Sequence, residues 1–256
     1  MRLSAIVITR NEQANIADCL SSLDFADEVI VLDSGSSDDT VAIARSLGAR
    51  VSLTTDWPGF GAQKNRALDL AGGDWVLSID ADERVTPALR QEILLSIEQA
   101  GAVNCFSMPR SSRFCGRFIR HSGWSPDYVD RLFRKGSARF SDDLVHERLV
   151  HKMPAKRLGQ PLLHYSYQDF SDVLLKVDRY SSDSAAQAFA RGRRASVVGA
   201  MGHGFWAFVR TYIVKVGFMD GAHGLALAIA SAEGSYYRHL KLWFLQQKTK
   251  RGLESR

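Results

Sequence analysis

Short apolar runs alternate with helix-like segments through the first hundred residues, and this alternation limits the possible folds most. The runs lie at residues 3–8, 29–32, 50–53 and 75–79. Between them apolar residues recur at helical spacing, and they do so again after the capping pair Thr86-Pro87. Strands that alternate with helices predict an α/β fold with a Rossmann-like, mostly parallel sheet that carries helices on both faces.

Polar side chains follow three of these runs directly. They are Thr9, Asn11, Glu12, Asp33, Ser34, Asp80 and Asp82. The carboxyl ends of parallel strands meet at one edge of a sheet, and open α/β sheets bind their ligands there. We therefore expect these side chains to gather around one ligand.

Two of these positions suggest specific chemistry. Asp33 opens a loop of small residues, where it can accept hydrogen bonds from a base or a ribose, although a capped strand-to-helix turn has the same composition. Asp80 and Asp82 are spaced so that both can bind one divalent cation, and hard oxygen ligands favour Mg²⁺ or Mn²⁺. Such a cation can neutralise a diphosphate leaving group.

A third group of polar residues opens a helix after the glycine-containing stretch GFGAQ. It consists of Lys64, Asn65 and Arg66. Cations at this place can meet the phosphates of a nucleotide. An ordinary charged helix face is the alternative interpretation.

Four segments resemble the motifs of family 2 glycosyltransferases, in the same order: TRNE, DSGSSDDT, GFGAQKNRAL and DADE. Shorter segments further on, VHE, HYSY, KVDRY and GFMDG, narrow the resemblance to a bacterial subgroup that includes lipopolysaccharide core glucosyltransferases. The resemblance implies a GT-A fold and a UDP-sugar donor. It also implies that Thr9, Glu12 and Asp33 hold the uridine part, that Asp80 contacts the ribose or the metal, and that Asp82 binds the metal.

The chemistry implied by the resemblance is an inverting displacement, which needs a general base for the acceptor hydroxyl. In the enzymes that the sequence resembles, a carboxylate from the segment after DADE serves as this base. Glu147, beside His146, is our first choice. Asp130 and Asp127 are the alternatives, and a surface ion pair with Arg148 is the other interpretation of Glu147.

The expected reaction transfers a hexose, glucose from UDP-glucose, to a cell-envelope glycan such as the lipopolysaccharide inner core. Residues 106–160 are rich in arginine, which suits an anionic glycan or glycolipid acceptor, although a solvated basic loop region has the same composition. Other lipid-linked or protein acceptors, and a non-catalytic nucleotide-sugar-binding protein of the same fold, are the alternatives. The sequence sets no oligomeric state.

Other classes of function fit less well. A dehydrogenase and a nucleotidyltransferase both need a glycine-rich loop after the first strand, where this chain has TRNEQAN. The formal net charge of +5 is accompanied by no nucleic-acid-binding motif, so we expect no nucleic-acid partner. Three distant cysteines and the spacing of the histidines match no zinc signature and no disulfide framework.

The expected organisation is a GT-A domain over residues 1–168, with a donor half at 1–105 and an acceptor half at 106–168. A helical segment follows at 169–256. The first apolar run is too short for a signal peptide and is expected to be a strand. Aromatic and basic residues from 205 onward predict amphipathic helices. We expect a cytoplasmic protein with peripheral contact at the cytoplasmic face of the inner membrane; helices packed on the core or on a second subunit are the alternative.

Overall fold

The computed structural model describes residues 2–141 and 147–254 of the chain. The chain forms two compact units, one from Met1–Ser111 and Asp127–His164, the other from Ser112–Pro126 and Tyr165–Arg256. The functional division expected at residue 168 stays a prediction.

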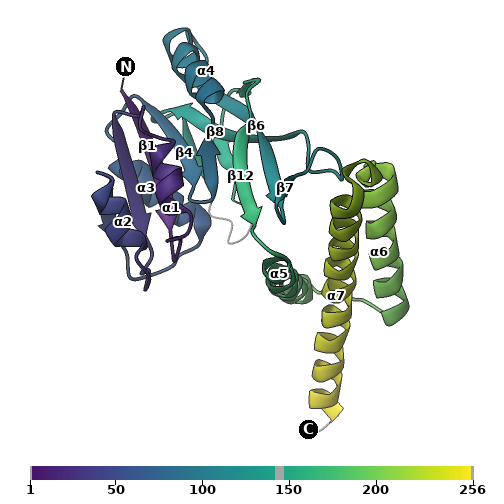
Figure 1. The fold of residues 1–256 in the computed structure, drawn as a ribbon. Helices are drawn as coiled ribbons and strands as arrows, with labels where there is room; N and C mark the ends of the chain where they lie inside the picture. The colour runs from purple at the N-terminus through teal and green to yellow at the C-terminus, as the bar shows by residue number, and fades with distance from the viewer. Residues whose placement is uncertain (1, 142–146, 255–256) are drawn as a thin grey trace. The chain divides into compact units, whose positions relative to one another are not determined.

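The first unit is built on a sheet whose first four strands are parallel (Figure 1). In spatial order they are β3 (Arg50–Leu53), β2 (Glu28–Asp33), β1 (Leu3–Thr9) and β4 (Trp75–Asp80). The sheet continues through β8 (Asp127–Arg134), β6 (Cys105–Phe114), β12 (Leu162–Tyr167) and β5 (Glu83–Val85). In this continuation β8 is antiparallel to β4 and to β6, and β12 is antiparallel to β5.

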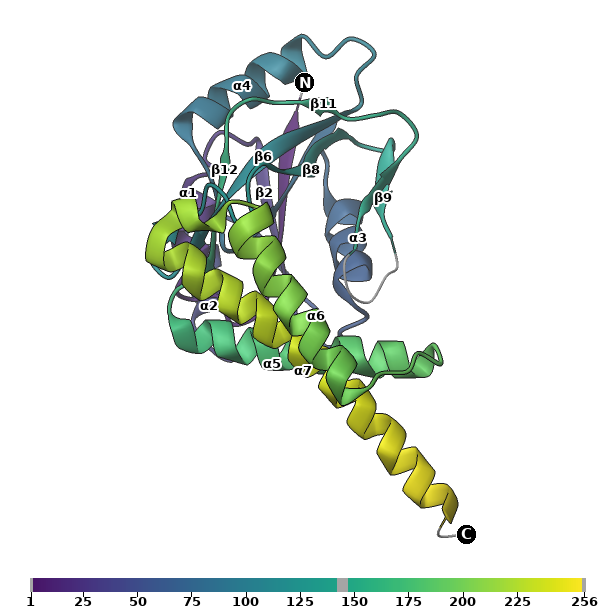
Figure 2. The same cartoon turned by 90° about the vertical axis from the view of Figure 1, so that its right-hand side faces the viewer.

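Helices cover both faces of this sheet because the side chains of each strand alternate between two cores. One core joins Leu3, Ala5 and Val7 of β1 to α1 (Ile16–Ser21), α2 (Thr40–Ser46) and α4 (Pro87–Glu98). The other joins Ile6 to α3 (Phe60–Leu70) and to β9 (Ala138–Phe140). Figure 2 shows α3 and β9 beside one another. The predicted α/β class with a covered, mainly parallel sheet is confirmed.

Local signals explain several boundaries. Thr86 caps α4, since its hydroxyl accepts a hydrogen bond from the Leu89 amide at 3.1 Å. Asn15 lies at the N-cap of α1 without a capping bond; its side chain donates to Glu12 instead. The short strands β10 (Leu149–His151) and β11 (Lys156–Arg157) complete the unit, β10 paired with β9 and β11 with β6.

The second unit is mainly helical, as predicted. It contains β7 (Arg117–Phe118), α5 (Phe170–Ala190), α6 (Val197–Val209), a π turn (Arg210–Val214), a 3₁₀ turn (Gly217–Asp220) and α7 (Gly221–Glu254). Asp220 accepts hydrogen bonds from the amides of Arg120 and His121 and from the Ser122 hydroxyl, so a buried carboxylate ties residues 120–122 to the start of α7.

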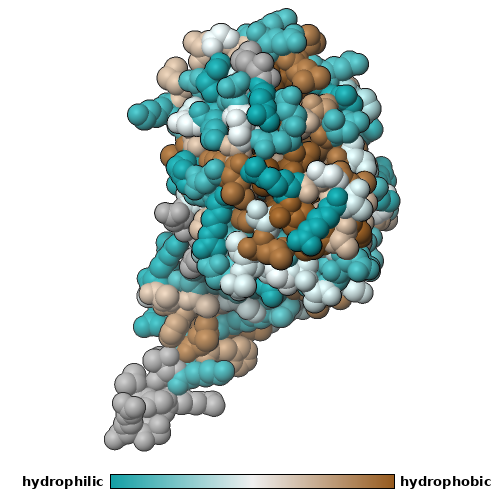
Figure 3. Space-filling view, turned by 90° about the vertical axis from the view of Figure 1, so that its left-hand side faces the viewer, coloured by the Kyte–Doolittle hydropathy of each residue, from teal (hydrophilic) through white to brown (hydrophobic). Residues whose placement is uncertain are grey.

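Both units leave large apolar side chains exposed. Figure 3 shows apolar surface gathered in the middle of one face and crossed by hydrophilic side chains. Within the described part of the chain, no single helix is both long enough and apolar enough to cross a membrane. One bent pair, Val197–Val214 with Gly217–Lys248 at 71°, meets the criterion by length and composition.

Candidate functional site

The strand register brings the predicted polar residues to the same level of the sheet. Thr9 of β1 lies opposite Asp33 of β2, and Ile8 of β1 lies opposite Asp80 of β4. All three strands are parallel, so their carboxyl ends form one edge. This is the place where open α/β sheets hold ligands.

Asp33 organises the loop that follows β2. Its side chain is buried and accepts four hydrogen bonds: from the Thr9 hydroxyl at 3.0 Å, the Gly35 amide at 3.0 Å, the Ser36 amide at 2.8 Å and the Ser36 hydroxyl at 2.5 Å. A carboxylate has about four acceptor positions. A hydrogen bond from a base or ribose would therefore replace or share one of these four.

The loops after β1 and β2 are joined to each other. Asn11, with a positive φ of 55°, accepts a hydrogen bond from the Ser37 amide at 2.8 Å. The Glu12 amide donates to the Thr40 hydroxyl at 2.8 Å. Ser34 accepts from Gln63, a buried residue of α3 that the sequence did not single out. The five residues predicted in these loops thus lie together.

Lys64 links the DADE segment to the candidate base. Its ammonium group is buried, 2.9 Å from Asp80 Oδ1 and 2.8 Å from Glu147 Oε1. Sequence alone gave no reason to place Glu147 near this edge of the sheet. Its neighbour His146 lies outside the described residues.

Arg131 of β8 neutralises the other side of Asp80. Its guanidinium lies 2.5 Å from Asp80 Oδ2 and 2.7 Å from Glu83 Oε1. Glu83 is fully buried and also accepts a hydrogen bond from the Asp80 amide at 3.0 Å. Neither residue was assigned a role from the sequence. The carboxylate network is defined here as Lys64, Asp80, Glu83, Arg131 and Glu147.

The pKa values of Asp80 and Glu83 shift in opposite directions. Burial alone would raise the pKa of Asp80, but Arg131 and Lys64 outweigh it and hold that pKa far below its usual range. Burial raises the pKa of Glu83 more than Arg131 lowers it. The Asp80 carboxylate is therefore firmly ionised.

Asp82 and His164 form a pair beside the network. His164 Nε2 lies 3.2 Å from Asp82 Oδ2, and the register of β12 with β5 places His164 opposite Glu83. The side chains are 25% (Asp82) and 16% (His164) exposed. His164 and Asp82 are 82 residues apart in sequence, and the pairing of β12 with β5 brings them together.

The donor set fits a divalent cation at Asp82. Asp82 offers a carboxylate that is 25% exposed, and carboxylate oxygen is the ligand that Mg²⁺ and Mn²⁺ prefer. Asp80 already contacts a cation with each oxygen. Asp82 with His164 would thus hold the ion, and each Asp80 oxygen keeps a second lone pair with which it could join them.

Other predicted residues have different partners. Asn65 exchanges two hydrogen bonds with the Phe140 main chain and holds α3 to β9. Arg66 pairs with Asp56 at the surface. Asp130 lies 3.1 Å from His151.

Asp127 pairs with Arg110, whose guanidinium also lies 3.9 Å from Glu83. Arg110 thus links Asp127 to Glu83 of the carboxylate network. The roles predicted for Asn65, Arg66, Asp127 and Asp130 stay predictions.

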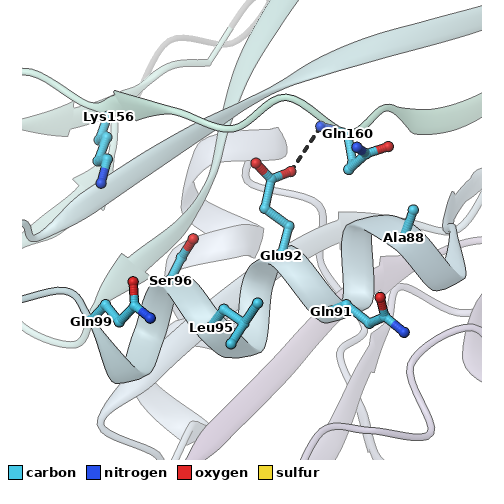
Figure 4. Close-up of a pocket in the computed structure, with 8 residues that line it drawn as sticks. All are labelled: Ala88, Gln91, Glu92, Leu95, Ser96, Gln99, Lys156 and Gln160. Carbon is cyan, nitrogen blue, oxygen red and sulfur yellow. Dashed lines mark hydrogen bonds between the residues drawn. The ribbon is translucent and has the colours of Figure 1, made fainter.

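A pocket of about 340 Å³ lies along α4 (Figure 4). Its lining is mostly polar and includes Gln91, Glu92 and Lys156. Glu92 accepts hydrogen bonds from the Gly159 and Gln160 amides and so holds the far wall of the pocket. None of the predicted site residues lines it, so we assign it no part in the candidate site.

Known proteins match most of this chain. The model for glycosyl transferase family 2 matches residues 4–159. An uncharacterized glycosyltransferase of Rickettsia felis is 31% identical over 258 residues, 94% of this chain and 89% of the relative. The lipopolysaccharide core biosynthesis glycosyltransferase LpsC of Rhizobium meliloti is 29% identical over 258 residues, 93% of each chain.

Solved structures match a smaller part. Glucosyl-3-phosphoglycerate synthase from Mycobacterium tuberculosis, crystallised with Mn²⁺, UDP and glucosyl-3-phosphoglycerate, is 30% identical with a TM-score of 0.38. The match covers 44% of this chain and 44% of that one.

Proposed function

Because the chain belongs to glycosyl transferase family 2, we propose that it is an inverting transferase that moves a hexose, glucose from UDP-glucose, to a cell-envelope glycan. The relative LpsC, whose name places it in lipopolysaccharide core biosynthesis, supports a core oligosaccharide as the acceptor. One observation carries the proposal: Lys64 joins Asp80, at the end of β4, to Glu147.

In this proposal the loops after β1 and β2 bind the uridine part, and a divalent cation at Asp82 and His164 would neutralise the diphosphate. Glu147 accepts the proton of the acceptor hydroxyl. The hydroxyl oxygen bonds to the anomeric carbon as the bond from that carbon to the diphosphate oxygen breaks, and UDP leaves with the electron pair. Lys64 holds Glu147 at one carboxylate oxygen, Oε1.

The assignment of the base is tested by Glu147→Gln. The amide keeps the size of the side chain but cannot take up a proton, so we expect kcat to fall by about 10²–10⁴ while UDP affinity, measured by calorimetry, stays near that of the wild type. Asp56→Asn, at a carboxylate that pairs with Arg66 on the surface, is the matched control and should keep most of its activity. An inactive Asp130→Asn with an active Glu147→Gln would transfer the role to Asp130.

We also propose that the second unit makes peripheral contact with the cytoplasmic face of the inner membrane. Apolar side chains of α6 are strongly exposed, among them Met201 at 61%, Phe205 at 71% and Trp206 at 56%. Arg210 and Lys215 follow α6 and are exposed. Aromatic side chains suit the boundary of the acyl region, and cations suit anionic head groups. At this location the enzyme would reach an acceptor glycan that is attached to a membrane lipid.

A further inference from the structure

Three side chains of different ligand chemistry converge in the first unit, outside the carboxylate network. They are Cys105 at the start of β6, Asp130 in β8 and His151 at the end of β10, and their ligand atoms all lie within 4.8 Å of one another. β6 and β8 belong to the large sheet, whereas β10 pairs only with β9 among the described strands. The cluster therefore joins the two sheets of this unit.

The hydrogen bonds of His151 fix which of its ring nitrogens carries a proton. Nδ1 lies 2.5 Å from the carbonyl oxygen of Met153, which can only accept, so Nδ1 must be the donor. Nε2 then lies 3.1 Å from Asp130 Oδ2. A neutral ring in this tautomer would turn a lone pair toward a carboxylate oxygen. The geometry therefore requires either a proton or a metal ion between Nε2 and the Asp130 carboxyl group.

Cys105 brings a third ligand atom into the same space, which a metal ion would use and a proton on Nε2 would not. We propose that Cys105, Asp130 and His151 hold a zinc ion, with a fourth position for water. Thiolate, imidazole and carboxylate are the ligands that Zn²⁺ takes in proteins, while Mg²⁺ and Mn²⁺ prefer oxygen.

The surroundings suit such an ion. Nδ1 donating to a backbone carbonyl is the usual outer contact that orients a metal-binding histidine. The Asp130 side chain is 33% exposed and gives the ion a path from solvent.

This site has a structural consequence for the candidate base. β10 begins at Leu149, two residues after Glu147, and the ion would hold β10 to β6 and β8. The site would also make Asp130 a metal ligand in place of a base. The spacing in the sequence matched no zinc signature because the three ligands come from three separate strands.

The test uses cobalt, a spectroscopic substitute for zinc, on the full chain after chelation of bound metals. Excess Mg²⁺ is added so that cobalt does not bind at sites whose ligands are oxygen atoms. We expect one equivalent of Co²⁺ to give a thiolate-to-cobalt charge-transfer band that zinc abolishes. Cys105→Ala should remove the band, and Cys115→Ala, at a half-buried cysteine of the other unit, should keep it. His151→Gln should weaken cobalt binding at least tenfold.

Two outcomes would overturn the zinc site: a folded wild-type protein that gives no band, or a band that survives Cys105→Ala. Circular dichroism reports whether each variant is folded. If Cys105→Ala does not fold, the cobalt affinity of His151→Gln tests the site instead. Asp82→Ala should keep the band, because the readout reports the thiolate and not the candidate donor site. Neither UDP binding nor transfer enters the measurement, so its failure would leave the proposed function untouched.

Discussion

At the scale of single residues, the candidate site depends on buried charges that need each other. Arg131 contacts both Asp80 and Glu83. Removing one partner of a buried ion pair leaves an uncompensated charge, and that costs more than the pair itself contributes. The network is therefore fragile toward single substitutions.

Arg131→Met tests this fragility, since it keeps the length of the side chain and removes the charge. We expect the free energy of unfolding, measured in urea, to fall by about 3–5 kcal/mol. Arg139→Met is the matched control, because Arg139 pairs with Asp69 at the surface and both side chains are about 60% exposed. That change should cost less than about 1 kcal/mol. Equal losses in the two variants would contradict the account.

Some site residues were predictable from the sequence and others were not. Asp33, Asp80 and Asp82 each follow an apolar run, so local pattern alone places them at the edge of the sheet. Arg131 and His164 reach the same edge through antiparallel pairings of β8 with β4 and of β12 with β5. Those pairings join segments far apart in sequence, and nothing in the local pattern fixes their register.

At the scale of elements, the position of Glu147 depends on how closely α3 approaches the end of β9. Gly61 in the first turn of α3 makes this approach possible, since a Cβ built there would lie 1.8 Å from the Ser141 carbonyl oxygen and 3.4 Å from Glu147 Cβ. A side chain at this position must push backbone aside. The second glycine of GFGAQ, Gly61, is thus explained by packing beside the candidate base.

Gly61→Ala should separate α3 from this segment. We expect a loss of about 1–3 kcal/mol in unfolding free energy, from overpacking, together with a marked fall in transferase activity. Gly202→Ala in α6 is the control, because a Cβ there meets nothing within 4 Å. It should leave activity unchanged and stability equal or slightly higher. An active, fully stable Gly61→Ala would show that the close approach is unimportant.

Elements with a sequence pattern of their own were predicted, whereas an element that depends on distant contacts was missed. The four parallel strands and the Thr86 cap were predicted, because each has a compact pattern of its own. The three-residue strand β5 within the DADE region was missed, since Glu83 and Arg84 are polar yet buried. Their burial is offset by ion pairs and backbone contacts, which only the assembled sheet supplies.

At the scale of the whole molecule, the two units serve different parts of the proposal. The first contains the candidate donor site, and the second exposes the apolar face of α6. The formal net charge of +5 favours association with anionic partners in general.

Sedimentation with vesicles tests the membrane contact. We expect the protein to bind vesicles that contain phosphatidylglycerol, more weakly as salt is raised, because the cations are screened. Phe205→Ser with Trp206→Ser should weaken binding at least tenfold, since each aromatic side chain contributes about 1.5–3 kcal/mol when buried. Leu53→Ser, exposed at 59% in the first unit, is the control. Unchanged binding in the double variant would contradict the proposed surface.

The central claim is that the ends of β1, β2 and β4 hold a nucleotide sugar with a divalent cation. The most direct measurement is the release of nucleoside diphosphate from a panel of UDP- and GDP-sugars, with and without Mn²⁺, by the wild type and by Asp82→Ala. The account predicts Mn²⁺-dependent release from UDP-glucose that is abolished in a folded Asp82→Ala. Release that needs no metal, or that persists in Asp82→Ala, would contradict it.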